Sequence, residues 1–282
     1  MERKEQVSLR DVSSFVGISM SVAWKIMRKH LAYKPYKPKS VAPLTAKHIS
    51  DRIRFCTWLL EQPVDFANRC LWSDEKWFHL KQHPNKQNER YWAPFDPEIE
   101  TECRVQGGEK VMCWAGIVKE KLIIHWFEEG ISVNSNTYLS MLKEVVWPKV
   151  RYAVNRDQIY FQQDGARVHT TPDVREWLDS KFNGRVISDK MDIQWPARSP
   201  DLSPFDYWFW GVAIAELQKC RPSNLDELKL VVEGLAESLD QDEISRGVQH
   251  IRRRAQVCLD AGGRRFEHKL RKSSSGFGGP DV

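Results

Sequence analysis

Four segments with the apolar pattern of β-strands constrain the fold of this chain most. Three of them follow one another, at 70–80, 111–118 and 122–127, and the polar turn Lys119–Lys121 joins the second to the third. The fourth, at 158–164, lies between segments with helical periodicity. Strands that first follow one another and then alternate with helices predict an α/β fold, with a mixed sheet flanked by helices.

The helices are predicted from their caps and apolar spacing. Thr45 is expected to cap the first helix of this region. Its apolar stripe comprises Ile49, Ile53, Cys56 and Leu60, and Lys47, Arg52 and Arg54 are expected to face away from part of that stripe. The next predicted elements are a helix at 136–147, a helix from Thr171–Pro172 to Gly184 and a short strand near 192–195. A helix from Ser203–Pro204 to about Lys219 and a helix from Ser223, with Asp226 completing a capping pair, follow. The last helix, near 242–260, is basic at 252–254 and stops at Gly262–Gly263.

Composition limits the classes of protein to consider. With 282 residues, of which 41% are hydrophobic, the chain can bury one sizeable core and a small appendage. The net charge of +5 fits a nucleic-acid partner, although many soluble proteins share it. The six cysteines form no CxxC pair, so we expect buried thiols rather than a zinc or redox site. Neither a secretory signal nor a run of about 20 apolar residues is present, so an intracellular protein without a membrane span is expected.

The segment 8–31 has the pattern of a helix-turn-helix. Gly17 is expected to end one helix and Ser19 to cap the next. The outer face of the second helix carries Ser21, Lys25, Arg28 and Lys29. A polar, basic second helix is what reading of the DNA major groove requires. A plain helical hairpin with a solvated basic face would fit the same pattern.

A linker follows at 33–44, where three prolines favour an extended path. Its lysines Lys34, Lys37 and Lys39 could contact phosphates along a groove. Taken alone, the segment fits a solvated spacer better.

Asp74 lies in the first predicted strand, on a face that is otherwise mostly apolar. A carboxylate at such a position costs free energy unless it is paired or binds a cation. A metal site and a salt bridge, for example to Lys76, both remain open from this strand alone.

Asp164 is expected to end the fourth strand, directly before Gly165. Ligand sites of open α/β sheets gather at such strand ends, but an aspartate that starts a turn is also common there. His169 could contact the same site or simply begin the next helix.

Asp206 falls in the first turn of the helix that Ser203–Pro204 opens, where a carboxylate can also serve as a partner of the helix dipole. Asp201 is a rival five residues earlier, and we expect it to be a turn or cap residue because the helix begins after it. Two strands and one helix would then supply three carboxylates. Such a set could hold two Mg²⁺ or Mn²⁺ ions, which can activate a nucleophilic oxygen and stabilise the leaving oxygen of a phosphodiester.

Three blocks with these acids resemble the catalytic blocks of mariner-superfamily transposases: WSDEKWF at 72–78, QQDGARVHT at 162–170 and WPARSPDLSPFDYWFWG at 195–211. The terminal VCLDAGGRRFEH at 257–268 also resembles that family, so the likeness covers about 8–270. The resemblance implies an RNase H-like fold, a catalytic and metal-binding triad of Asp74, Asp164 and Asp206, and selection of Asp206 over Asp201. It further implies metal-dependent endonuclease cleavage at transposon ends, attack of a DNA 3′-hydroxyl on target DNA at a TA dinucleotide, a homodimer, and a nuclear location.

Two departures from the family are visible. The 41 residues between Asp164 and Asp206 exceed the usual mariner gap, and we expect the extra length around FNGRVISDKMD at 182–192 to form a surface loop. The family usually carries two helix-turn-helix units, whereas one, corresponding to the second, is recognisable here. A truncated gene model, a degenerate copy or a domesticated DNA-binding protein with little catalysis would each fit. A nuclease for RNA–DNA hybrids is disfavoured by the helix-turn-helix and by the third block.

The predicted organisation has four parts. A helix-turn-helix at 1–32 precedes a basic linker at 33–47 and an RNase H-like catalytic domain at 48–270. The tail at 271–282 is expected to be disordered. The segment between 92 and 110 is a candidate protruding loop for dimer contacts.

Overall fold

The computed structural model describes residues 9–31, 43–80, 108–153 and 159–270. The chain divides into two compact units, Met1–Pro43 and Leu44–Val282, which we describe separately. Lys34, Lys37 and Lys39, most of the candidate dimer loop and the tail lie outside the described residues. Within the described ranges, no helix has the length and apolar character that a membrane span requires.

The first unit contains helix α1 (Leu9–Val16), helix α2 (Met20–Lys25) and a π-helical turn, Ile26–His30, that continues α2. Gly17 ends α1 with φ +72°, and the Ser19 hydroxyl accepts the backbone N–H of Val22 at 3.4 Å. The predicted break and cap are therefore confirmed. Ala23 is buried, whereas several large apolar side chains of the two helices, such as Phe15 and Trp24, are exposed.

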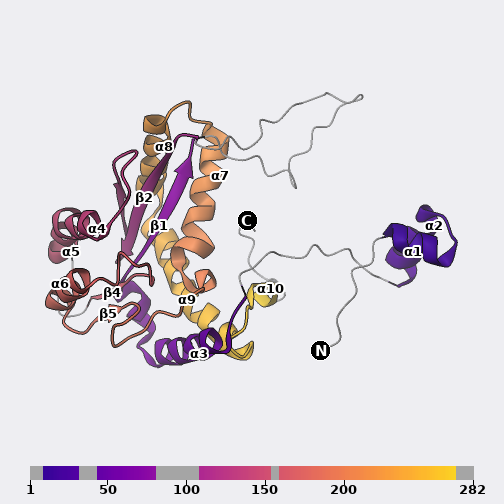
Figure 1. Cartoon of the computed structure of the whole chain (residues 1–282), viewed down its shortest axis with the longest axis horizontal. Coiled ribbons are helices and arrows are strands. Elements are labelled where there is room, and N and C mark those ends of the chain that lie inside the picture. Colours follow the sequence, from indigo (N-terminus) through magenta and orange to yellow (C-terminus); the bar gives the residue numbers. More distant parts are fainter. Residues whose placement is uncertain (1–8, 32–42, 81–107, 154–158, 271–282) are drawn as a thin grey trace. The chain divides into compact units, whose positions relative to one another are not determined.

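The second unit is built on a mixed sheet with the order β3-β2-β1-β4-β5 (Figure 1). Strand β1 (Cys70–His79) pairs antiparallel with β2 (Lys110–Val118), which pairs antiparallel with β3 (Lys121–Trp126). On its other side β1 pairs parallel with β4 (Tyr160–Gln162), and β4 pairs parallel with β5 (Val186–Ile187). The strands at 70–80, 111–118 and 122–127 are thus found where the apolar pattern predicts them.

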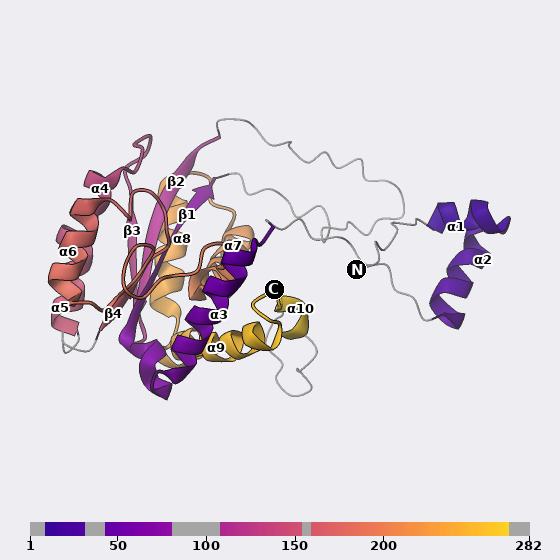
Figure 2. The same ribbon diagram turned by 60° about the horizontal axis from the view of Figure 1, so that its bottom comes forward.

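Helices cover both faces of this sheet (Figures 1 and 2). One face packs on α3 (Ala46–Glu61), α7 (Trp210–Cys220), α8 (Leu225–Ser238) and α9 (Gln241–Asp260). The other packs on α4 (Ser135–Met141), the π-helical turn Leu142–Val146, α5 (Trp147–Ala153) and α6 (Pro172–Phe182). The remaining elements are 3₁₀ segments Val64–Arg69 and Pro200–Leu202, the π-helical turn Phe205–Phe209 before α7, and α10 (Glu267–Leu270).

Alternation along the strands separates the two cores, because successive side chains point to opposite faces. Cys70, Trp72 and Phe78 of β1 pack in the core under α3, α7, α8 and α9, whereas Leu71 packs in the other core. Asp74 shares the face of Trp72, and Glu75 lies on the opposite face. This separation decides which partners each acid meets.

Several expected details differ in the structure. Strand β4 stops at Gln162, so Asp164 lies two residues beyond the strand rather than at its end. The segment 182–192, expected as a surface loop, contains β5. Helix α8 is capped by Asn224, which accepts the N–H of Glu227, instead of by the pair expected at Ser223 and Asp226.

Arginines of α3 and α9 make contacts inside the fold, and Arg52, which was expected to face away from part of the apolar stripe of α3, is one of them. Arg52 is fully buried, and Arg254 is 9% exposed and donates to the backbone carbonyl of Asp201. Arg252 donates to the carbonyls of Leu59 and Gln62 at the end of α3. These guanidinium groups fasten α3, α9 and the segment around Asp201 together. Helix α3 itself begins at Ala46, inside the range expected as linker.

Candidate active site

The register of two parallel strands places Asp74 and Asp164 at the same level. Trp72 of β1 is the partner of Gln162 in β4, and each aspartate follows two residues after its member of that pair. Ser73 reinforces this register, because its hydroxyl donates to the carbonyl of Gln162 at 2.7 Å. Sequence alone contains no such pairing information, since 89 residues separate the two segments.

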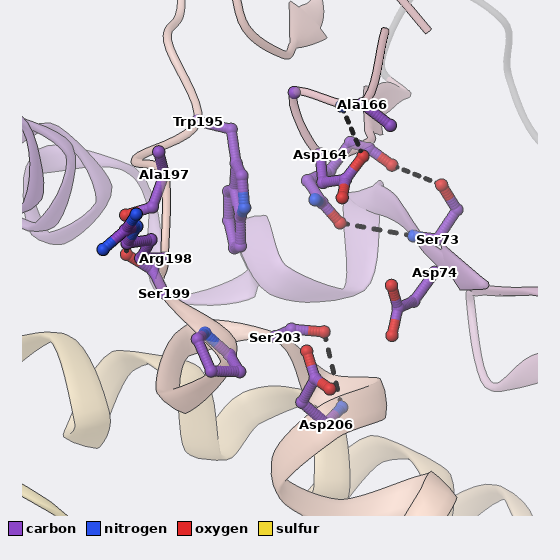
Figure 3. A pocket seen from close by; sticks show the side chains of 13 residues that line it. Ser73, Asp74, Asp164, Ala166, Trp195, Ala197, Arg198, Ser199, Ser203 and Asp206 are labelled. Carbon is purple, nitrogen blue, oxygen red and sulfur yellow. Dashed lines mark hydrogen bonds between the residues drawn. The ribbon is translucent and has the colours of Figure 1, made fainter. Parts of the chain in front are cut away.

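A cavity of about 380 Å³ lies beside this strand pair and is lined by Asp74, Asp164 and Asp206. Figure 3 shows the three carboxylates pointing toward one another from β1, from the loop after β4 and from the helical segment before α7. Trp195, Pro200 and Gly165 also line the cavity. A Cβ atom on Gly165 would lie 3.2 Å from the Cβ of Asp189, so the loop packs tightly here.

Asp74 is the most enclosed of the three acids. Burial and the neighbouring charge of Asp206 raise its pKa well above its usual value, and a hydrogen bond from Trp210 opposes that shift. The indole Nε1 of Trp210 lies 2.6 Å from Asp74 Oδ2. A carboxylate in this environment favours a proton or a cation as its neutralising partner.

Asp164 has a different environment. Its Oδ1 accepts the backbone N–H of Ala166 at 2.9 Å and lies 2.7 Å from Nδ1 of His169. Burial would raise the pKa of Asp164, but the hydrogen bond and charge of His169 outweigh it, and the pKa is lowered. Both of these contacts use the same carboxylate oxygen, and the side chain is 53% exposed toward the cavity.

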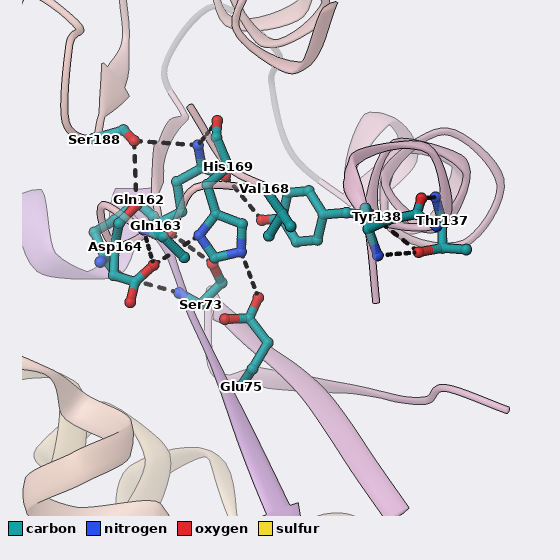
Figure 4. Close-up of polar contacts among 12 residues, drawn as sticks. Ser73, Glu75, Thr137, Tyr138, Gln162, Gln163, Asp164, Val168, His169 and Ser188 are labelled. Carbon is teal, nitrogen blue, oxygen red and sulfur yellow. Dashed lines mark hydrogen bonds and ion pairs between the residues drawn. The ribbon is translucent and has the colours of Figure 1, made fainter. Parts of the chain in front are cut away.

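His169 connects Asp164 to an acid on the other face of β1 (Figure 4). Its Nε2 lies 3.3 Å from Oε1 of Glu75. Burial lowers the pKa of His169, but Glu75 and Asp164 raise it more, to about 10. The ring of Tyr138 lies 4.3 Å from the imidazole, and the Tyr138 hydroxyl donates to Gln163. His169 therefore contacts the site, one of the two outcomes that the sequence left open.

Glu75, Asp164 and His169 also stand close enough together to hold a metal ion. However, each ring nitrogen of His169 already faces a carboxylate, and a pKa of about 10 gives the ring a positive charge. A protonated imidazole donates hydrogen bonds and cannot bind a metal. We therefore interpret this group as a set of ion pairs behind Asp164.

Asp206 completes the cavity from the opposite wall. Its backbone N–H donates to the Ser203 hydroxyl at 3.4 Å, although the N-cap residue of the π-helical turn is Pro204 rather than the predicted Ser203. Enclosure raises the pKa of Asp206 to about 6, while the charge of Lys76 and a hydrogen bond from Ser203 lower it in part. Its side chain is nevertheless exposed to the cavity.

Asp201, the rival acid, belongs to a separate buried cluster. Both of its oxygens accept bonds from Arg52, at 2.6 and 2.7 Å, and its side chain is 2% exposed. Arg52 also donates to the Ser199 hydroxyl and to the carbonyl of Gly263. The expectation of Asp201 as a turn or cap residue therefore understates its role, because it anchors the segment that leads to Asp206.

Comparison of the sequence with known proteins finds similarity to transposases. No protein-family model matches the chain. The Tc3 transposase of Caenorhabditis elegans is 29% identical over 149 residues, or 52% of this chain and 41% of that protein. The Tc1 transposase of the same organism is 26% identical over 195 residues, or 68% of each chain. The chain is therefore similar in sequence to the Tc1 and Tc3 transposases.

Solved structures show that the fold is shared as well. A chain of the Mos1 mariner paired-end complex with Mn superposes with a TM-score of 0.78 at 21% identity, covering 94% of this chain and 77% of that one. The Mos1 catalytic domain with raltegravir and Mg gives 0.61 at 22% identity, covering 80% of this chain and all of that domain. The predicted RNase H-like mixed sheet flanked by helices is confirmed. The match to Tc3 transposase spans less than half of that protein.

Proposed function

We propose that this chain is a metal-dependent DNA transposase whose endonuclease site is formed by Asp74, Asp164 and Asp206. The observation that carries the proposal is the convergence of these three carboxylates on one cavity, two of them with raised pKa values. Repulsion between Asp74 and Asp206 is relieved when a cation binds between them. Carboxylate oxygens are the donors that Mg²⁺ and Mn²⁺ prefer, so the residues present fit a divalent ion.

The proposed reaction has two phosphoryl-transfer steps. Water attacks the phosphorus at a transposon end, and the bond to the leaving 3′-oxygen breaks to release a 3′-hydroxyl. That hydroxyl then attacks a target phosphodiester, whose own 3′-oxygen leaves. Two bound Mg²⁺ or Mn²⁺ ions would activate the attacking oxygen and stabilise the leaving one. Asp74, Asp164 and Asp206 would hold these ions. His169 keeps Asp164 ionised and oriented.

A plasmid assay tests the proposal. Supercoiled plasmid is incubated with the full chain and Mn²⁺, and conversion to open-circular and linear DNA is measured over time. The matched control is Asp173→Asn, at an exposed acid in the first turn of α6, the helix that follows the loop of Asp164. We expect Asp164→Ala to lower nicking at least 100-fold and Asp173→Asn to leave it unchanged. Equal nicking by all three proteins, or none by any, would favour the alternative of a transposase-derived DNA-binding protein.

We propose duplex DNA as the partner of the first unit. Ser21, Lys25, Arg28 and Lys29 are all exposed on α2 and the turn that continues it. We expect Lys25→Ala and Arg28→Ala to weaken duplex binding and to reduce its dependence on salt by about one ion each. Binding is measured by fluorescence anisotropy at several salt concentrations. Unchanged affinity in both variants would show that this helix does not contact the DNA.

We propose that two copies act together, because Mos1 structures with likeness to this chain are paired-end complexes. Light scattering of the chain with and without end-sequence DNA tests this. A single copy per DNA end pair would contradict it.

A further inference from the structure

Trp210 lies behind Asp74 and comes from the same helical segment as Asp206. Asp206 and Trp210 are four residues apart, so about one helical turn separates them and both lie on one side of the segment. That side faces β1, which brings the indole to Asp74 while the carboxylate of Asp206 faces the cavity. A single rigid segment therefore contributes one acid and the hydrogen-bond donor to another.

The position of the indole is set by packing. Trp210 is 3% exposed, and its ring lies 5.1 Å from Phe205, 5.3 Å from Phe209 and 5.7 Å from Phe78, measured between ring centroids. Contacts with three aromatic rings fix the direction of the N–H group without help from Asp74. The N–H therefore directs the carboxylate, and the carboxylate does not direct the ring.

The bond between them is short and joins a neutral donor to an acid. At 2.6 Å it is shorter than a typical N–H···O contact. An indole N–H only donates, so it can neither bind a metal nor accept the proton of Asp74. It fixes Oδ2 and the rotation of the carboxylate, and in doing so it determines which oxygen faces the cavity.

We propose that Trp210 is a positioning residue that holds Asp74 in the orientation needed for metal binding. The inference rests on the proposed function, because it concerns the same metal-facing acid. Outer partners of metal ligands typically change metal affinity about 10- to 100-fold when they are removed. Loss of the indole donor should therefore weaken metal binding even where the fold is intact.

The chain offers a matched control in Trp126. Its Nε1 donates to Oε1 of Glu233 at 2.9 Å, and its ring also lies 5.7 Å from Phe78. Trp126→Phe thus removes an indole–carboxylate bond next to the same phenylalanine, but Glu233 does not line the cavity. Comparison of the two variants separates loss of packing from loss of orientation at Asp74.

The first experiment measures Mn²⁺ affinity by calorimetry in the full chain, at a temperature where circular dichroism shows every variant folded. We expect Trp210→Phe to weaken Mn²⁺ binding about tenfold and Trp126→Phe to change it less than twofold. Plasmid nicking by Trp210→Phe should recover substantially at saturating Mn²⁺. Equal affinities for the two variants would reduce Trp210 to a packing residue.

A second measurement covers the case in which Trp210→Phe does not fold. In wild-type protein with ¹⁵N-labelled indoles, one strongly hydrogen-bonded signal should shift when Mg²⁺ is added, and Asp74→Asn should move it upfield and abolish the response. If no indole signal depends on Asp74, the proposal is wrong. If Asp74→Asn binds Mn²⁺ as tightly as wild type, the proposed function itself fails, so the two failures are distinguishable.

Discussion

Asp201 and Asp206 lie five residues apart in one segment, yet they stand in opposite electrostatic environments. Asp201 accepts two hydrogen bonds from the guanidinium of Arg52, and its side chain is 2% exposed. Asp206 opens onto a cavity that it shares with two other carboxylates. One region has its charge balanced within the protein, and the other has an excess of negative charge.

This difference indicates what each region does. A buried and fully paired charge costs free energy to form but makes the fold intolerant of losing either partner. A cluster of like charges weakens the metal-free fold and strengthens binding of a cation. We therefore interpret the buried pair of Arg52 and Asp201 as a structural support, and the three carboxylates at the cavity as the candidate site.

The largest effect is expected for Asp201→Asn. The substitution leaves the buried guanidinium of Arg52 without its counter-charge, and losses of this kind cost about 3–5 kcal/mol. Chemical denaturation should show a fall of that size in the free energy of unfolding. Mg²⁺ should still stabilise the variant wherever it remains folded, because the cavity acids are unchanged. A fall below about 1 kcal/mol would show that the pair is not a support.

Asp206→Asn should give the reverse result. Without metal, its stability at neutral pH should equal or exceed that of wild type, because a repelled carboxylate is removed. Wild type should gain about 2.7 kcal/mol when Mg²⁺ is present at 100 times its Kd, and the variant should lose most of that gain. Thermal unfolding with EDTA and with Mg²⁺ measures both values. If Mg²⁺ stabilises Asp206→Asn as much as it stabilises wild type, Asp206 does not take part in binding the cation, and the proposed difference from Asp201 is wrong.

The pH dependence of metal binding should reflect both Asp206 and Asp74, because the pKa of each is raised. The pKa of Asp206 is raised to about 6, so a proton competes with the cation below that pH. The raised pKa also means that the protonated form stabilises the metal-free fold below pH 3.8, a contribution that is lost as the pH rises through 6. Apparent Mg²⁺ affinity should fall about tenfold per pH unit below 6 for each proton displaced, or about 1.4 kcal/mol. Calorimetry between pH 5 and 8 would show this, and a flat profile would contradict it.

The sequence predicted the acids better than it predicted their supports. Asp74, Asp164 and Asp206 could be selected because the three blocks that contain them resemble the catalytic blocks of one family; an aspartate near a strand end or in a first helical turn is common on its own. Arg52 could not be placed in this way, because its partner is 149 residues away. Its spacing gave one signal: Arg52 precedes Cys56 by four residues, so it lies on the same buried stripe of α3.

The same limit explains the errors around the sheet. Strand β5 has two residues and follows a turn at Asn183 and Gly184, too short a run for the alternation of side chains to be visible. The level arrangement of Asp74 and Asp164 depends on the register between Trp72 and Gln162, which is a property of two strands together. Contacts between Glu75 and His169 likewise join segments that a local pattern cannot relate.

The smallest effect is expected for Ser203→Ala, which lies between the two regions. The Ser203 hydroxyl accepts the N–H of Asp206, and removal of a side-chain acceptor at the start of a helix costs about 1 kcal/mol. The hydroxyl also lowers the pKa of Asp206, so its loss should weaken Mg²⁺ binding modestly and shift the pH profile upward. Ser203→Thr should restore both properties, because it retains the hydroxyl. If Ser203→Ala instead destabilises the fold as much as Asp201→Asn, then the support extends through Ser203 to Asp206, and the boundary between the two regions lies closer to the cavity than the pairing of Asp201 indicates.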